Sequence, residues 1–300
     1  MTASREIRGP PVQLIVNIVV LSSIYALIAC GYVLIYRVSR VLNLAHGELM
    51  MLGAYILLTV ASLFTQNATA ALAAALCLSL AVGLLVYLFL MRKMTGEMVL
   101  AAVLTTIALG ILLRGLVVLI WSAQQQYPAQ ALALDNPPIV LPGGARISAF
   151  AAILVVATGL IYGALFAFLR FGRWGVRMRA AGQNPLLAAQ RGINLHVIYA
   201  LAWGLSTLTG ALAGMLIALD SGLTGTMVTI GLKAFPAALV GGLDSLAGAL
   251  LGSLIVGTAE VLLVYINPLL SDVVPFGVLI VMLILRPWGL FGTREELDRV

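Results

Sequence analysis

Long apolar runs separated by short polar or basic segments make up most of this sequence. A helix needs about 20 residues to cross the hydrocarbon core of a bilayer, and nine runs reach or approach that length. They predict membrane spans near residues 12–36, 41–64, 70–91, 98–121, 147–169, 197–219, 226–243, 245–266 and 273–288. The pattern therefore predicts an all-α, polytopic integral membrane protein of about eight or nine transmembrane helices, with residues 1–300 in a single domain.

Two of the predicted spans, the second and the seventh, are irregular. The second opens with the polar cluster Asn43 to Glu48, and the seventh carries Lys233, Pro236 and the pair Gly241–Gly242. Proline removes a helical hydrogen bond, and broken helices occur in transporters where the backbone lines a cavity. We therefore expect an irregular or broken second span and a seventh span that is irregular, broken or re-entrant.

Composition supports the membrane assignment. Hydrophobic residues make up 62% of the chain and charged residues 9%, compared with about 25% charged residues in soluble domains. Lipid must therefore solvate most of the exterior, since so few charged side chains cannot cover a water-facing surface. Cys30 and Cys77 lie in apolar runs without CxxC spacing, so we expect two buried thiols and neither a disulfide framework nor a metal site.

The distribution of basic residues predicts the orientation of the chain. Twelve of the 17 basic residues lie in four segments that nine crossings place on one side, and these are Arg37, Arg40, Arg92, Lys93, Arg170, Arg173, Arg177, Arg179, Arg191, Arg286, Arg294 and Arg299. The positive-inside rule makes that side cytoplasmic, which explains the net charge of +6 without a nucleic-acid partner. We expect a cytoplasmic C-terminus and a periplasmic N-terminus, despite Arg5 and Arg8.

Charged residues inside predicted spans are functional candidates, because each costs about 2.5–3.5 kcal/mol at mid-membrane. The candidates are Glu48, Arg114, Lys233, Glu260 and Asp244, with Asn43 and His46 as neutral companions. A buried Lys233–Glu260 pair would serve either a structural or a transport role. Arg114 would either extend toward the membrane surface or pair internally.

The start of the second span has two interpretations. Asn43 could cap a helix that begins inside the membrane, and Gly47 would let a ligand or another backbone approach. Such a helix presents free N–H groups and a positive dipole end to an anion such as a carboxylate. Alternatively, Glu48 faces loop residues near Arg40.

The motifs Gly210–Gly214 and Gly248–Gly252 predict close helix packing.

The cytoplasmic loop 170–197 contains a predicted short helix. Asn184 is suited to its N-cap, Pro185 to its first position and Gly192 to its end, with Leu186 and Leu187 on an apolar side. This helix could lie on the membrane surface or dock into a groove of a soluble partner.

Four ordered motifs carry a family resemblance: NLAHGELMMLGAY (43–55), AAGQNPLLAAQRGIN (180–194), GLKAFPAALVGGLDSLAGALLG (231–252) and GTAE (257–260). Over about residues 12–290 the chain resembles the permease subunit of branched-chain amino-acid ABC importers, the shorter of two paralogous permeases. The resemblance implies a second permease, two cytoplasmic ATP-binding subunits and a periplasmic substrate-binding protein in the bacterial inner membrane.

The polar groups inside the spans are the candidates for the substrate pathway, and these residues are Asn43, His46, Gly47, Glu48, Lys233 and Glu260. The resemblance maps the family's coupling segment onto residues 181–194. ATPase-coupling residues would be Ala181, Asn184, Pro185, Leu186, Leu187, Ala189, Arg191 and Gly192. Family permeases often carry an acidic residue where this chain has Gly182–Gln183.

The chain itself is predicted not to be an enzyme. No GxxxxGK[ST] motif occurs, and the only lysines are Lys93 and Lys233, so ATP would be used by partner subunits and this chain would bind no cofactor or metal. Two alternatives remain: a related ABC permease for urea or short amides, and a self-contained secondary transporter or channel that moves substrate without ATP.

Overall fold

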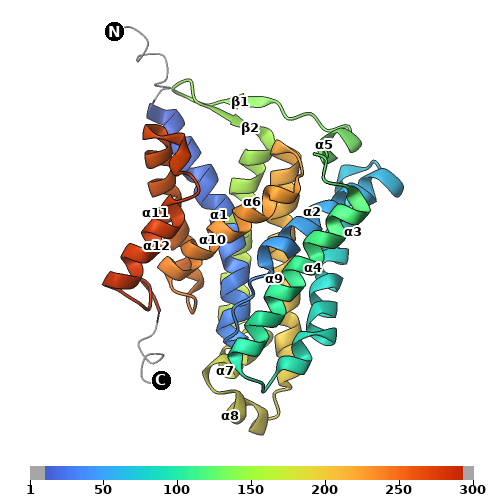
Figure 1. Cartoon of the computed structure of the whole chain (residues 1–300), viewed down its shortest axis with the longest axis vertical. Helices are drawn as coiled ribbons and strands as arrows, with labels where there is room; N and C mark the ends of the chain where they lie inside the picture. The colour runs from blue at the N-terminus through green and yellow to red at the C-terminus, as the bar shows by residue number, and fades with distance from the viewer. Residues whose placement is uncertain (1–10, 293–300) are drawn as a thin grey trace.

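The computed structural model describes residues 11–292, which form an almost entirely helical body (Figure 1). The helices in the described chain are α1 (Pro11–Ser39), α2 (His46–Leu63), α3 (Ala68–Phe89), α4 (Val99–Trp121), α5 (Pro128–Ala131), α6 (Ala149–Phe171), α7 (Arg173–Gln183), α8 (Pro185–Gln190), α9 (Leu195–Ser221), α10 (Val228–Gly241), α11 (Leu246–Ile266) and α12 (Val274–Leu285). Three 3-10 turns are η1 (Met91–Met94), η2 (Gly225–Met227) and η3 (Pro268–Leu270). The all-α prediction is confirmed.

Seven helices of the described chain are long and apolar enough to cross a membrane: α1, α2, α3, α4, α6, α9 and α11. Two further apolar segments, Gly225–Gly241 and Val274–Leu285, are shorter. Each of these nine elements overlaps one of the nine predicted runs, with ends that differ by a few residues. The chain is therefore a multi-pass membrane protein.

The two ends of the body differ. At the end that lies uppermost in Figure 1, which we call the hairpin end, the strands β1 (Pro138–Val140) and β2 (Arg146–Ser148) pair antiparallel beside α5. The Gln-, Pro- and Gly-rich composition of residues 122–146 predicts a surface loop, and the structure adds α5 and this hairpin within and just after it. The opposite end, called the α8 end, carries α7 and α8. Arg5, Arg8, Arg294 and Arg299 and both chain termini lie outside the described residues.

α2 begins later than predicted, at His46 and not near residue 41. Asn43 is not its N-cap, which corrects the prediction: Ala45 occupies that position, and no side chain caps the helix. The Asn43 side chain accepts a hydrogen bond from the Ala45 N–H at 3.1 Å, while the Leu44 N–H donates to Thr106 Oγ1 on α4 at 3.1 Å. Contacts to α4 and a local turn therefore hold residues 42–45 out of helical geometry.

α2 starts at the level of the middle of its neighbours. His46 Nε2 lies 3.1 Å from the carbonyl oxygen of Ile28, which is near the midpoint of α1. A Cβ on Gly210, near the midpoint of α9, would come 2.9 Å from the His46 ring. The helix start is thus buried inside the body, as the irregular second span led us to expect.

α10, the seventh apolar segment, is a short helix that continues through Pro236. Its 14 residues span about 21 Å at 1.5 Å per residue, less than a bilayer core. Its first turn crosses the start of α2: a Cβ on Gly47 would lie 3.0 Å from the Val228 carbonyl oxygen and 3.4 Å from Gly231 Cα. α2 and α10 therefore meet at their N-terminal ends, where only glycine permits the crossing.

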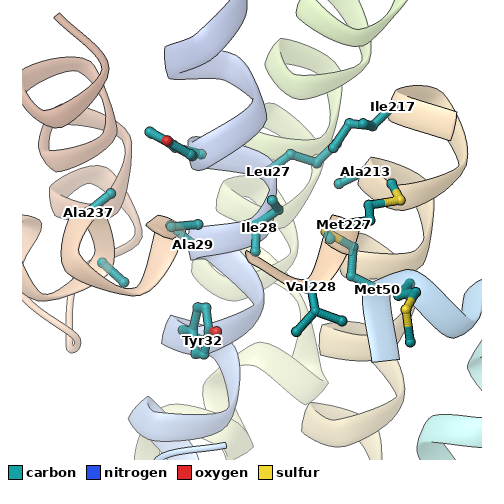
Figure 2. Close-up of a cluster of buried hydrophobic side chains, with 14 of the residues drawn as sticks. Leu27, Ile28, Ala29, Tyr32, Met50, Ala213, Ile217, Met227, Val228 and Ala237 are labelled. Atoms are coloured by element: carbon teal, nitrogen blue, oxygen red, sulfur yellow. The ribbon is translucent and has the colours of Figure 1, made fainter. Parts of the chain in front are cut away.

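Small residues also allow other helix pairs to pack closely. Figure 2 shows residues of α1, such as Leu27, Ile28 and Ala29, surrounded by side chains of α2, α9 and α10 in the main buried cluster. The GxxxG prediction agrees with the contacts, because a Cβ on Gly214 would collide with the Met50 backbone and one on Gly252 with that of Ala237.

The prediction of two buried thiols is half wrong: Cys30 is buried, whereas Cys77 is exposed on α3.

Candidate functional site

The start of α2 holds four of the predicted pathway residues, all buried. The His46 ring packs edge-on against Tyr32 with ring centroids 4.6 Å apart, and its Nδ1 lies 3.4 Å from Ser206 Oγ. Glycines at 31 and 210 leave room for this ring, since a Cβ at either position would press on it. His46 is thus clamped between α1 and α9. Asn43 keeps one unsatisfied donor, because its Nδ2 has no partner among the described residues.

Glu48 pairs with Arg114 of α4. Its Oε1 accepts hydrogen bonds from Arg114 Nε at 2.8 Å and Nη2 at 2.6 Å. The Glu48 side chain is 5% exposed, whereas that of Arg114 is 57% exposed. Of the two possibilities for Arg114, the structure therefore shows pairing, and Glu48 does not interact with Arg40, which binds Asp244 at 2.5 Å instead.

The predicted pair of Lys233 and Glu260 forms the centre of a second polar cluster. Lys233 Nζ lies 3.4 Å from Glu260 Oε1, 2.9 Å from Ser271 Oγ and 2.7 Å from Asp272 Oδ1. Glu260 also accepts hydrogen bonds from the Tyr25 hydroxyl at 2.5 Å and from Ser271 at 2.9 Å. The hydrogen bond from Lys233 and its positive charge lower the pKa of Asp272, which stands in the loop before α12.

Tyr32 lies between the two clusters. Its ring contacts His46, and its hydroxyl donates to the Gly231 carbonyl oxygen on α10 at 3.1 Å. Sequence reasoning missed Tyr32, Tyr25 and Ser271, because uncharged residues in apolar surroundings give no separate signal. Arg114 was noticed as a charge but was not assigned to the pathway. Among residues 11–292, no three His, Cys, Asp or Glu side chains gather as a metal site.

The predicted coupling residues lie together at the α8 end. Asn184 caps α8 by accepting a hydrogen bond from the Leu187 N–H at 3.0 Å, Pro185 is the first helical residue, and Gly192 has a φ of +79°. Leu186 and Leu187 are 69% and 56% exposed. These local predictions agree with the structure.

α7 connects this surface to the core. Ala181 is fully buried, and a Cβ on Gly182 would collide with the carbonyl oxygen of Arg37 at the end of α1. This contact explains why an acidic side chain is absent at position 182, where only glycine fits. Ala189, within α8, and Arg191, directly after it, are exposed. Movement of α8 would therefore reach α1 through α7.

Comparison with known proteins identifies relatives over nearly the whole chain. Residues 14–283 match the model of the family described as branched-chain amino acid transport system / permease component. No solved structure matches the chain.

Three relatives illustrate the similarity. The high-affinity branched-chain amino acid transport system permease protein LivH of Escherichia coli is 31% identical, with 96% of this chain and 97% of the relative covered. The permease protein BraD of Pseudomonas aeruginosa has the same identity and coverage. A probable LivH of Methanocaldococcus jannaschii is 27% identical over 91% of this chain and 90% of its own.

Proposed function

This chain belongs to the family of branched-chain amino-acid transport permease components, and on that premise we propose that it is one of two paralogous permeases of an ATP-driven importer for branched-chain amino acids. The observation that carries the proposal is the family match from residue 14 to residue 283. The chain works with ATP-binding and substrate-binding partners, as a component of an ABC system. In our proposal these partners are two cytoplasmic ATPases and one periplasmic binding protein, and the two permeases lie in the inner membrane.

The proposed substrate pathway runs past the meeting point of α2 and α10. Asn43, His46, Gly47 and Glu48 lie at the start of α2, where Gly47 contacts the first turn of α10. Lys233 and Glu260 lie further along α10 and α11. Short helices that begin inside a bundle are typical of transporter binding regions. The mechanism is alternating access, in which these elements change their packing while the outer helices remain in lipid.

In this proposal the α8 end faces the cytoplasm and the hairpin end faces the periplasm. Arg170, Arg173, Arg177, Arg179 and Arg191 cluster around α7 and α8, whereas Arg146 is at the hairpin. Cysteines introduced at Gln125 and Gln183 in a cysteine-free background test this orientation. An impermeant thiol reagent should label intact cells only at position 125, and labelling at 183 would reverse the assignment.

The main experiment measures leucine uptake by proteoliposomes that contain the purified complex and its binding protein. We expect leucine uptake only when ATP is present on the side of the membrane where the ATPases lie. Unlabelled Leu, Ile and Val should compete with this uptake, whereas Lys, Glu and urea should not. Preference for urea or a short amide would support a different ABC permease. Uptake by this chain alone, driven by a gradient and indifferent to ATP, would support a secondary transporter or channel.

Coupling to the ATPases is proposed to pass through α8. Its two exposed leucines are suited to an apolar groove, since burying one leucine contributes about 1.5–3 kcal/mol. Leu187→Glu should abolish uptake and substrate-stimulated ATPase activity or release the ATPases. Gln190→Glu places the same charge at an exposed position of the same helix and is the control. If Leu187→Glu retains normal uptake, α8 rests on the membrane surface and does not couple.

A further inference from the structure

Arg114 is a charged residue that is exposed on the membrane-spanning helix α4, away from the end of that helix. It lies seven residues before the end of α4 at Trp121, or about 10 Å into the helix at 1.5 Å per residue. Its side chain is 57% exposed on the outside of the described chain. A charged group that faces lipid at this depth is unfavourable. A polar environment on this side of α4 in the assembled transporter would remove that cost.

Glu48 fixes the direction of the guanidinium group. It takes two N–H groups, from Nε and Nη2, through the single oxygen Oε1. A guanidinium has about five N–H donors, so most remain available on the exposed side. The other carboxylate oxygen, Oε2, has no hydrogen-bond partner in the part of the chain that the structure describes. One unused acceptor and several unused donors thus stand side by side.

Gly110 keeps this arrangement open. It lies one turn before Arg114 on α4, and a Cβ there would come 3.1 Å from the Glu48 carboxyl carbon and 3.2 Å from Oε1. The carboxylate therefore rests against bare backbone, in reach of Arg114. An alanine at 110 would require the Glu48 carboxylate to move by a few tenths of an ångström.

We propose that Arg114 and Glu48 form a subsite for the zwitterionic head group of the transported amino acid. The free N–H groups of Arg114 bind the substrate carboxylate, and Glu48 Oε2 accepts from its ammonium group. This inference rests on the proposed function and specifies which end of the substrate the pathway recognises.

The surroundings suit an aliphatic side chain. Ile107, Ile111 and Val118 occupy positions three or four residues apart, next to Arg114 on the same side of α4, and are 39%, 68% and 49% exposed. They offer an apolar surface without further charge beside the ion pair. Leucine, isoleucine and valine fit this arrangement. Their zwitterionic head group would bind Arg114 and Glu48, and their branched side chain would pack against these three apolar residues.

Substrate protection of a cysteine next to the pair tests the proposal. Ile111→Cys is made with Cys30 and Cys77 replaced, and the complete transporter is placed in nanodiscs, where both faces are accessible. The probe is a neutral, water-soluble methanethiosulfonate. Leucine at ten times its dissociation constant should slow labelling about tenfold, because about a tenth of the sites remain free. Leu112→Cys, on the opposite side of α4 and 58% exposed, is the control and should show no protection.

Two further comparisons identify the groups involved. Arg114→Gln in the Ile111→Cys transporter should abolish protection, and Arg114→Lys should retain only part of it. Leucinamide, which lacks the carboxylate, and 4-methylpentanoate, which lacks the ammonium group, should each protect less than leucine.

Each outcome decides the question. No reaction at Ile111→Cys would place this side of α4 in lipid or in a dry interface and overturn the subsite, as would protection that survives Arg114→Gln. If wild-type vesicles take up leucine with ATP while protection is absent, the inference alone fails. If they take up no leucine, the proposed function fails with it.

Discussion

Two ion pairs, one near the start of α2 and one on α10, are built in opposite ways. Lys233 is 13% exposed and contacts oxygens of Glu260, Ser271 and Asp272, while Glu260 receives a further hydrogen bond from Tyr25. Arg114 is 57% exposed, and Glu48 is its only hydrogen-bonding partner among the described residues. The first pair uses its hydrogen-bonding capacity within the protein, and the second leaves most of it unused.

We infer from this difference that the Lys233–Glu260 pair mainly holds the helices along the proposed pathway together, whereas the Arg114–Glu48 pair is suited to binding. Buried polar groups that are fully paired stabilise one arrangement, and here the Lys233 cluster ties α10 to α1, α11 and the loop before α12. Unpaired donors and acceptors in a partly open position suit a ligand that arrives and leaves. The sequence alone does not distinguish these roles, because the members of both pairs look like isolated charges in apolar spans.

The largest expected effect is loss of stability on removing the buried carboxylate of the α10 cluster. Glu260→Ala leaves Lys233 and the Tyr25 hydroxyl without their shared partner, and breaking a buried pair costs about 3–5 kcal/mol. Glu48→Ala is the matched substitution, and because Arg114 is half-exposed it should cost only about 1 kcal/mol. Melting midpoints of the two purified complexes compare them. Equal losses would remove the distinction between the pairs.

A smaller effect is expected from a single hydroxyl. Tyr25→Phe removes the hydrogen bond to Glu260 Oε2 and should cost about 1.5–3 kcal/mol, because its acceptor is charged. Tyr32→Phe is the control: its hydroxyl donates to the neutral Gly231 carbonyl oxygen, so the loss should be about 0.5–1.5 kcal/mol. Thermal melting in the same detergent checks the order, and a larger loss from Tyr32→Phe would contradict it.

The sequence predicted those features that depend on nearby residues. Apolar length located the nine helical segments, and Asn184, Pro185 and Gly192 located α8 because a cap and a stop act within a few positions. The charges inside spans two and seven correctly indicated irregular elements.

Pairing across the fold could not be predicted in the same way. Arg114 and Glu48 are 66 positions apart, and Tyr25 and Glu260 are 235 apart. Which of them meet depends on how the helices pack, and helix packing here follows glycines such as Gly47 and Gly110 whose partners the sequence does not name. The assignment of Asn43 as a cap was wrong for the same reason, since a contact to Thr106 on α4 shapes residues 42–45.

The smallest expected effect lies at the exposed edge of the α10 cluster and depends on pH. Lys233 lowers the pKa of Asp272, whose side chain is 85% exposed, so the Lys233–Asp272 link stabilises the fold only slightly. A carboxyl with a lowered folded-state pKa contributes stability above its unfolded pKa of about 3.9, and the contribution is lost as the pH falls through the folded value.

Asp272→Asn should therefore melt slightly below wild type at pH 7, and the difference should close as the pH falls from about 4 through the lowered folded-state pKa of Asp272. Asp135→Asn removes a carboxylate that makes no ion pair in the described chain, so its difference from wild type should not change with pH in this way. Melting curves at pH 7, 5 and about 3.5 measure both variants. Because Glu260 still holds Lys233 when Asp272 is neutral, α10 should keep its place throughout the titration. If the difference in melting midpoint between Asp272→Asn and wild type widens in acid, the ionised Asp272 carboxylate is less favourable to the folded state than its protonated form. The stabilising cluster would then end at Glu260.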